Sequence, residues 1–87
     1  MDFLTAAAIG RFVDIDAALE KEIAAWHVLA AAVPAPALHV YLGMTAEQYA
    51  SWIEQRVTAQ QLVAEHCSTL DPAWLEQARA LFRPRHV

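Results

Sequence analysis

The chain has 87 residues and a formal net charge of −4, from 10 acidic and 6 basic side chains. Because binding to nucleic-acid phosphates depends on clustered Lys and Arg, this charge argues against general affinity for nucleic acid. Hydrophobic residues make up 57% of the chain, but 19 of them are alanines, which bury little area. We therefore expect one helical domain over 1–87, whose thin core favours a protein partner or a homodimer.

The cellular compartment is predicted from three features. Cys67 is the single cysteine, so no internal disulfide can form. Acidic Asp2 stands where a signal peptide would carry its basic region. Two prolines and a glycine interrupt the longest uncharged run, between Glu22 and Glu47, so no membrane span is expected. The sequence thus predicts a cytoplasmic protein.

In chain order, the first element is a short apolar helix over about 3–12, weakly specified and expected to fray. The next helix has clearer limits, since Asp14 or Asp16 can cap its start and Pro34 ends it. A 4-4-3-4-3 spacing keeps its apolar positions on one face: Ile15, Leu19, Ile23, Trp26, Ala30 and Val33. Alanines on its flanks allow another helix to approach closely.

Residues 36–55, PALHVYLGMTAEQYASWIEQ, read as a corner between two helices. Residues 37–42 are long enough for about two helical turns. Gly43 suits the left-handed residue that closes a helix. Thr45 and Gln48 have the spacing of a capping box, which begins the following helix.

That following helix is predicted over 46–67, and polar residues in its middle leave room for a bend or a change of packing partner. Asp71 caps a last helix, Pro72 takes its first position and Pro84 ends it. The predicted fold is all-α, a compact bundle of four to five short helices. In it the 46–67 helix runs antiparallel to the second helix, and the last helix closes the core.

Three tryptophans, Trp26, Trp52 and Trp74, fall on the apolar stripes of the three main helices. We predict that they meet in one core. The alternative is that one of them is an exposed anchor for a partner, since interfaces favour Trp and Tyr.

Catalytic and metal chemistry find little support. Cys67 with His27 or His39 as base would be the only nucleophile pair to consider, and such residues occur in many unrelated small proteins. Neither these residues nor His66 has the spacing of a zinc site. We predict no enzymatic activity, no metal and no cofactor.

The two helices of the corner and the turn between them also have about the lengths found in a helix-turn-helix motif. Its second helix offers Glu47, Ser51 and Glu54 and no base before Arg56, which disfavours DNA. Two alternatives remain beside a protein-binding module. One is a dimeric regulator that binds DNA through the Gly43 turn, and the other is a helical subunit of a larger assembly. The regulator would be helped by C-terminal bases: Arg79, Arg83 and Arg85.

Trp26-His27 and the later run LHVYLGMTAEQYASW resemble a class of small bacterial and prophage proteins. Their pattern is Trp-His, a short loop, then Leu-His-x-Tyr/Phe-Leu-Gly-Met-Thr-x-x-x-Tyr-x-x-Trp. The resemblance covers about residues 14–55, and the loop AAAVPAPA departs from it. It implies an accessory, regulatory or antitoxin-like protein that works by binding, and it carries over no catalytic residue.

We therefore predict a non-enzymatic accessory or inhibitor module that binds a protein. Its contacts are expected on the acidic face of the second helix and at the corner. The predicted partner-binding residues are Asp16, Glu20, Trp26, His27, Leu38, His39, Tyr41, Met44, Tyr49 and Trp52.

Overall fold

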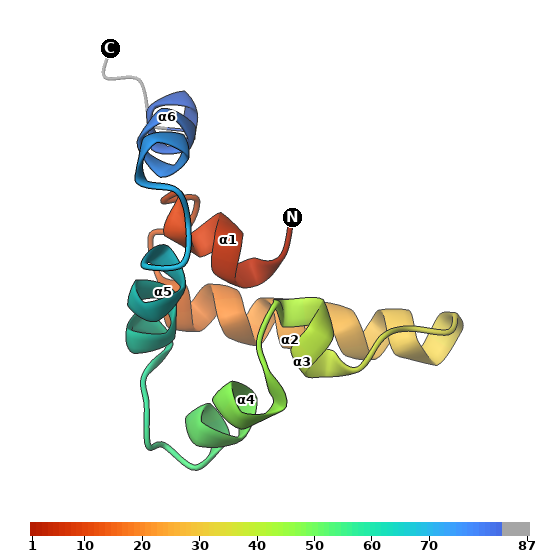
Figure 1. Ribbon diagram of the computed structural model, residues 1–87. Coiled ribbons are helices and arrows are strands. Elements are labelled where there is room, and N and C mark those ends of the chain that lie inside the picture. Colours follow the sequence, from red (N-terminus) through yellow and green to blue (C-terminus); the bar gives the residue numbers. More distant parts are fainter. Residues whose placement is uncertain (83–87) are drawn as a thin grey trace.

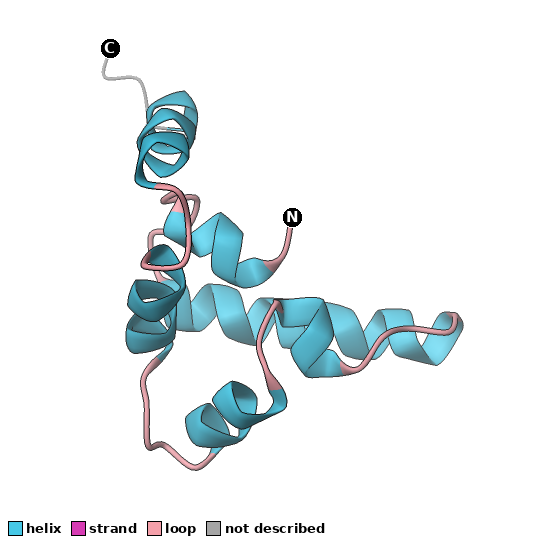
Figure 2. Cartoon of the chain, viewed as in Figure 1, coloured by secondary structure: helices cyan, strands magenta, loops and turns pink. Residues whose placement is uncertain are grey.

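A computed structural model describes residues 1–82 as helices joined by short loops (Figures 1 and 2). The all-α prediction is confirmed. This part of the chain holds six helices: α1 (Phe3–Ala8), α2 (Ile15–Ala32), α3 (Leu38–Leu42), α4 (Ala46–Ile53), α5 (Ala59–Cys67) and α6 (Pro72–Phe82).

The predicted helix over 46–67 is wrong as a single helix, because it is divided into α4 and α5. Gln55 adopts a left-handed φ of 61°, which a continuous helix cannot contain. Thr58 then starts a new helix through a second capping box, in which its hydroxyl accepts from Gln61 N at 3.1 Å. The Gln61 side chain returns the bond by accepting from Thr58 N at 2.7 Å.

The expected antiparallel pair of long helices is lost with this division. α5 packs on α1 and on the N-terminal half of α2, whereas α4 follows α3. The side chain of Gln48 links α4 to α5 by donating to Glu65 at 3.5 Å.

The first segment forms the centre of the core. Phe3, Leu4 and Ile9 are buried, and α1 lies between α2 and α6 (Figure 1). Asp2 fixes its start, since its carboxylate accepts from Thr5 N at 2.8 Å. The main cluster consists of Phe3, Leu4, Ala7, Leu19, Leu42, Met44, Ala59, Leu62 and Val63.

A smaller cluster joins α6 to the end of α1. It contains Ala8, Ile9, Leu75 and Ala78. Arg79 strengthens this contact, because its Nε donates to the carbonyl of Ala8 at 2.9 Å and so caps the C-terminal end of α1. Three residues of the predicted C-terminus, Arg83, Pro84 and Arg85, lie outside the described residues.

The prediction that the three tryptophans meet in one core is wrong. Trp52 is half-buried against the main cluster. The indole N–H of Trp26 donates to the loop carbonyl of Pro36 at 2.9 Å. Trp74 is 42% exposed on α6. Smaller residues fill the core in their place, since α1 brings its own apolar side chains to the centre.

The molecule is elongated, with extents of 40 × 28 × 21 Å. Figure 1 shows why: the C-terminal half of α2 projects past the other helices before the chain folds back to α3. Among the described residues no helix is both long enough and apolar enough to cross a membrane.

Candidate functional site

The most unusual surface is this projection, residues 24–37, which we call the arm. It carries no charged residue, because the chain has none between Glu22 and Glu47. Its apolar side chains are nevertheless in contact with solvent: Val28 is 73%, Leu29 39% and Val33 49% exposed. Single exposed apolar residues are common, whereas a contiguous uncharged group of them marks an interaction surface.

The apolar side chains of the arm are exposed because α2 has two apolar faces and only one of them packs on the core. The inner face packs on the core through Leu19, which is fully buried, with Ile15 and Ile23 half-buried beside it. The outer face lies on the other side and consists of Ala25, Val28, Leu29 and Ala32, all exposed. A helix that is apolar on more than one face is normally buried on all of them. Here only the inner face is covered.

The arm is held in a defined shape. Trp26 Nε1 donates to the carbonyl of Pro36 at 2.9 Å, which ties the returning loop against α2. The ring of Trp26 also meets His27 edge-on, with centroids 5.1 Å apart. The extended residue Val33 closes α2 by donating its N–H to the carbonyl of Leu29 at 3.0 Å. An apolar surface with such restraints loses little conformational entropy on binding.

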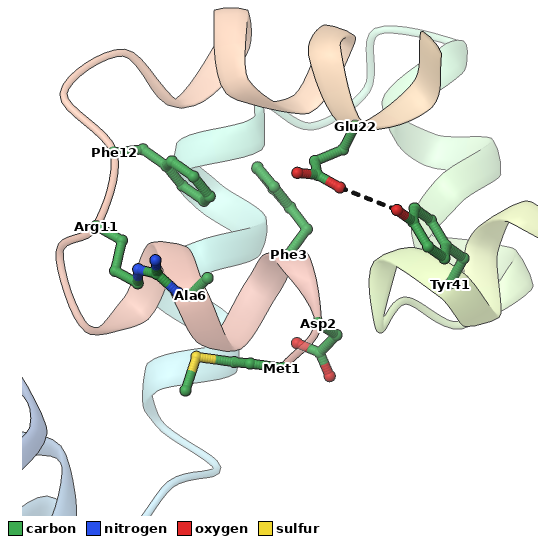
Figure 3. A pocket seen from close by; sticks show the side chains of 8 residues that line it. All are labelled: Met1, Asp2, Phe3, Ala6, Arg11, Phe12, Glu22 and Tyr41. Carbon is green, nitrogen blue, oxygen red and sulfur yellow. Dashed lines mark hydrogen bonds between the residues drawn. The ribbon is translucent and has the colours of Figure 1, made fainter. Parts of the chain in front are cut away.

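At the base of the arm a polar contact joins α2 to α3. The hydroxyl of Tyr41 donates to Glu22 Oε2 at 3.3 Å (Figure 3). Desolvation raises the pKa of Tyr41, and the adjacent Glu22 carboxylate raises it further. The neutral phenol is therefore the form that this contact favours.

The corner has the local structure that its sequence predicts. Gly43 closes α3 with a φ of +82°, and the capping box of Thr45 and Gln48 begins α4. His39 Nδ1 donates to the carbonyl of Met44 at 3.1 Å across the turn. Met44 itself is buried in the main cluster. Much of the corner chemistry thus serves the fold.

The predicted partner-binding residues fall into separate groups. Asp16 and Glu20 are exposed on the N-terminal half of α2, and Gln60 on α5 donates to Asp16 at 3.3 Å. Tyr49 and Trp52 pack together on α4, with ring centroids 6.1 Å apart. The remaining residues lie on the arm or on the corner beside it: Trp26, His27, Leu38, His39, Tyr41 and Met44.

Sequence reasoning missed the outer face of α2. Val28 and Leu29 lie off the stripe that the sequence assigned to the core, and they were not among the predicted contacts. The available signal was the combination of an uncharged run with apolar residues on both sides of one helix. Periodicity alone could not say which of the two faces would remain uncovered.

A small pocket lies between the start of α1, α2 and α3 (Figure 3). Its volume of about 200 Å³ is below the roughly 300–1,000 Å³ of most small-molecule sites. Its lining residues are Met1, Asp2, Phe3, Ala6, Arg11, Phe12, Glu22 and Tyr41. Within residues 1–82 no three His, Cys, Asp or Glu side chains are grouped to hold a metal ion.

Comparisons with protein-family models, with curated proteins and with solved structures each found no match.

Proposed function

We propose that this protein is a non-enzymatic binding module, an accessory or inhibitory factor that works in the cytoplasm by covering part of another protein. A prophage- or antitoxin-like role, which the Trp-His and Leu-His motifs suggest, belongs to this proposal. The observation that carries it is the uncharged apolar arm, whose outer face is not covered by the rest of the described chain.

Covering the arm is favourable on physical grounds. Removing an apolar side chain from water contributes roughly 1.5–3 kcal/mol when a Val or Leu becomes fully buried. Val28, Leu29 and Val33 are each exposed enough to supply part of this. Because the loop is already tied to α2 through Trp26, the surface needs little ordering on binding.

The acidic start of α2 is a suitable rim for such an interface. Asp14, Asp16 and Glu20 are exposed there, one to three turns from the arm. Rim charges act mainly on the association rate and on the choice of partner. Basic side chains on a partner would therefore speed its association with this surface.

The charges on and beside α4 favour a protein partner over DNA. Glu47 lies on α4, the helix that would enter a DNA groove, and Glu54 caps its C-terminal end; both are exposed carboxylates. Arg56 follows them, and its guanidinium pairs with Glu54. Carboxylates at this position repel phosphates, which supply most of the affinity in nucleic-acid binding.

The test is affinity capture from a lysate of the source organism with matched variants, run with and without nuclease. Val28→Glu places a carboxylate on the outer face of the arm, and Leu81→Glu places one on α6, where Leu81 is 83% exposed. We expect a protein captured by the wild type and by Leu81→Glu, and at least tenfold less of it with Val28→Glu. Equal capture by both variants would refute the arm as the contact, and capture of nuclease-sensitive material alone would favour DNA.

A further inference from the structure

We propose that the arm is covered by a second copy of this chain, with the two α2 helices antiparallel across a two-fold axis. This inference rests on the proposed function, because it takes the arm as a protein-binding surface. It goes further by naming the occupant and the register in which it binds.

The outer face of α2 is symmetric in sequence. Its residues Ala25, Val28, Leu29 and Ala32 follow at i, i+3, i+4 and i+7, which places them on one helical stripe. The order along the stripe is small, large, large, small. It therefore reads the same in both directions about the midpoint between Val28 and Leu29.

A two-fold axis at that midpoint makes this stripe complementary to itself. Val28 of one copy then faces Leu29 of the other, and Ala25 faces Ala32. The large side chains fill the centre of the contact, while the alanines at both ends allow the helices to approach closely. An isologous interface requires that a surface match itself in this way.

Charge fixes the direction of the pairing. In the antiparallel arrangement the acidic segment 14–22 of one copy extends past the C-terminal end of the other α2, because α2 ends at Ala32 and the chain then folds back toward α3 (Figure 1). A parallel arrangement would instead set the two acidic segments side by side, and like charges that face each other are destabilising. The charge distribution along α2 thus disfavours the parallel dimer and permits the antiparallel one.

Lys21 adds a favourable contact in the same register. It is the base within the acidic segment, and it lies one helical turn before Ala25 on the outer face. Antiparallel pairing brings it to the C-terminal end of the other α2, whose last turn holds no basic residue of its own. Cations are stabilising at helix C-termini.

The size of the arm sets the expected affinity. The helical part, residues 24–32, is about 14 Å long, and Val40 on α3 adds a further apolar side chain that is 56% exposed. Interfaces that bury less than about 1,200 Å² belong mainly to weak, reversible complexes. We expect a monomer–dimer equilibrium with a Kd of about 1–100 µM.

Sedimentation velocity of the purified chain from about 1 to about 200 µM tests this range. The wild type and the control Leu81→Glu are expected to associate in the same way. Val28→Glu and Leu29→Lys are each expected to weaken association at least tenfold. When these two variants are mixed, the new carboxylate faces the new ammonium group while the second Val–Leu contact stays native, so association should return.

Helicity measured by circular dichroism separates lost pairing from lost folding. If a central variant unfolds, the end pair Ala25→Glu and Ala32→Lys tests the same register. A wild type that stays monomeric over the whole range, or a mixture that fails to associate, overturns the proposal. If the wild type is monomeric and Val28→Glu still reduces capture from lysate, the arm binds a different protein and the proposed function stands. If capture is unchanged as well, both fail.

Discussion

At the scale of single residues, two glycines with left-handed backbone form a matched pair. Gly10 and Gly43 have φ values of +83° and +82°, but only Gly43 is crowded. A Cβ at position 43 would lie 2.7 and 2.8 Å from the carboxylate oxygens of Asp2, whereas one at position 10 would meet nothing within 4 Å. The same backbone conformation therefore has different tolerance for a side chain at the two sites.

We expect Gly10→Ala to lower the free energy of unfolding by about 1 kcal/mol, the usual cost of a left-handed alanine. Gly43→Ala should cost about 1 kcal/mol more, because it also displaces the Asp2 cap of α1. Urea unfolding of both variants measures this. In an Asp2→Ala background the difference between the two glycines should disappear, and a difference that persists would contradict the explanation.

Tyr41 gives the fold a dependence on alkaline pH. Because its pKa is raised in the folded state, the unfolded chain loses the phenol proton first as the pH increases. The contribution of the neutral Tyr41 phenol to the free energy of unfolding is fully present below about pH 10, and it is lost as the pH rises through the folded-state pKa. Tyr41→Phe should show a smaller loss of stability between about pH 8 and about pH 11 than Tyr49→Phe does. Equal losses in urea unfolding would refute this.

At the scale of elements, the two capping boxes serve helices of different importance. α5 buries Ala59, Leu62 and Val63, whereas none of the residues of α4 is fully buried. Thr58→Ala should therefore lower the global free energy of unfolding by about 1 kcal/mol. Thr45→Ala should instead accelerate amide hydrogen exchange within α4, with a smaller global effect. The reverse pattern would mean that α4, not α5, anchors this half of the fold.

Local signals in the sequence were sufficient for most helix ends. Asp14 accepts from Ala17 N at 3.0 Å, and Gly43 and Thr45 act as their residue types predict. Each of these ends depends on residues within four positions, which a sequence pattern records directly. The box of Thr58 and Gln61 lies among good helix formers, and the polar residues around it indicate only room for a bend or a change of packing partner.

Features set by tertiary packing were not predictable in the same way. The burial of Leu4 in α1 depends on α5, which is distant in the sequence. Trp26 was predicted to be in the core because it lies on the inner stripe, but its indole N–H reaches the Pro36 carbonyl instead. The outer face of α2 could not be identified either, since apolar periodicity does not show which stripe the fold leaves uncovered.

At the scale of the whole molecule, the core and the arm differ in how far their apolar side chains are covered. The core gathers around α1 and α5, and its described residues leave no buried side-chain polar atom without a hydrogen-bond partner. The arm leaves this core, with alanines and exposed valines where a surface helix would carry charge. The inner face of α2 is thus covered within one chain, whereas the outer face leaves its apolar side chains exposed.

The most direct test of this account is amide hydrogen exchange of the arm at two protein concentrations, about 1 and about 100 µM. If a second chain covers the arm, exchange of residues 24–32 should slow at least severalfold at the higher concentration, while exchange in α5 stays the same. Equal exchange of the arm at both concentrations would contradict self-association through α2.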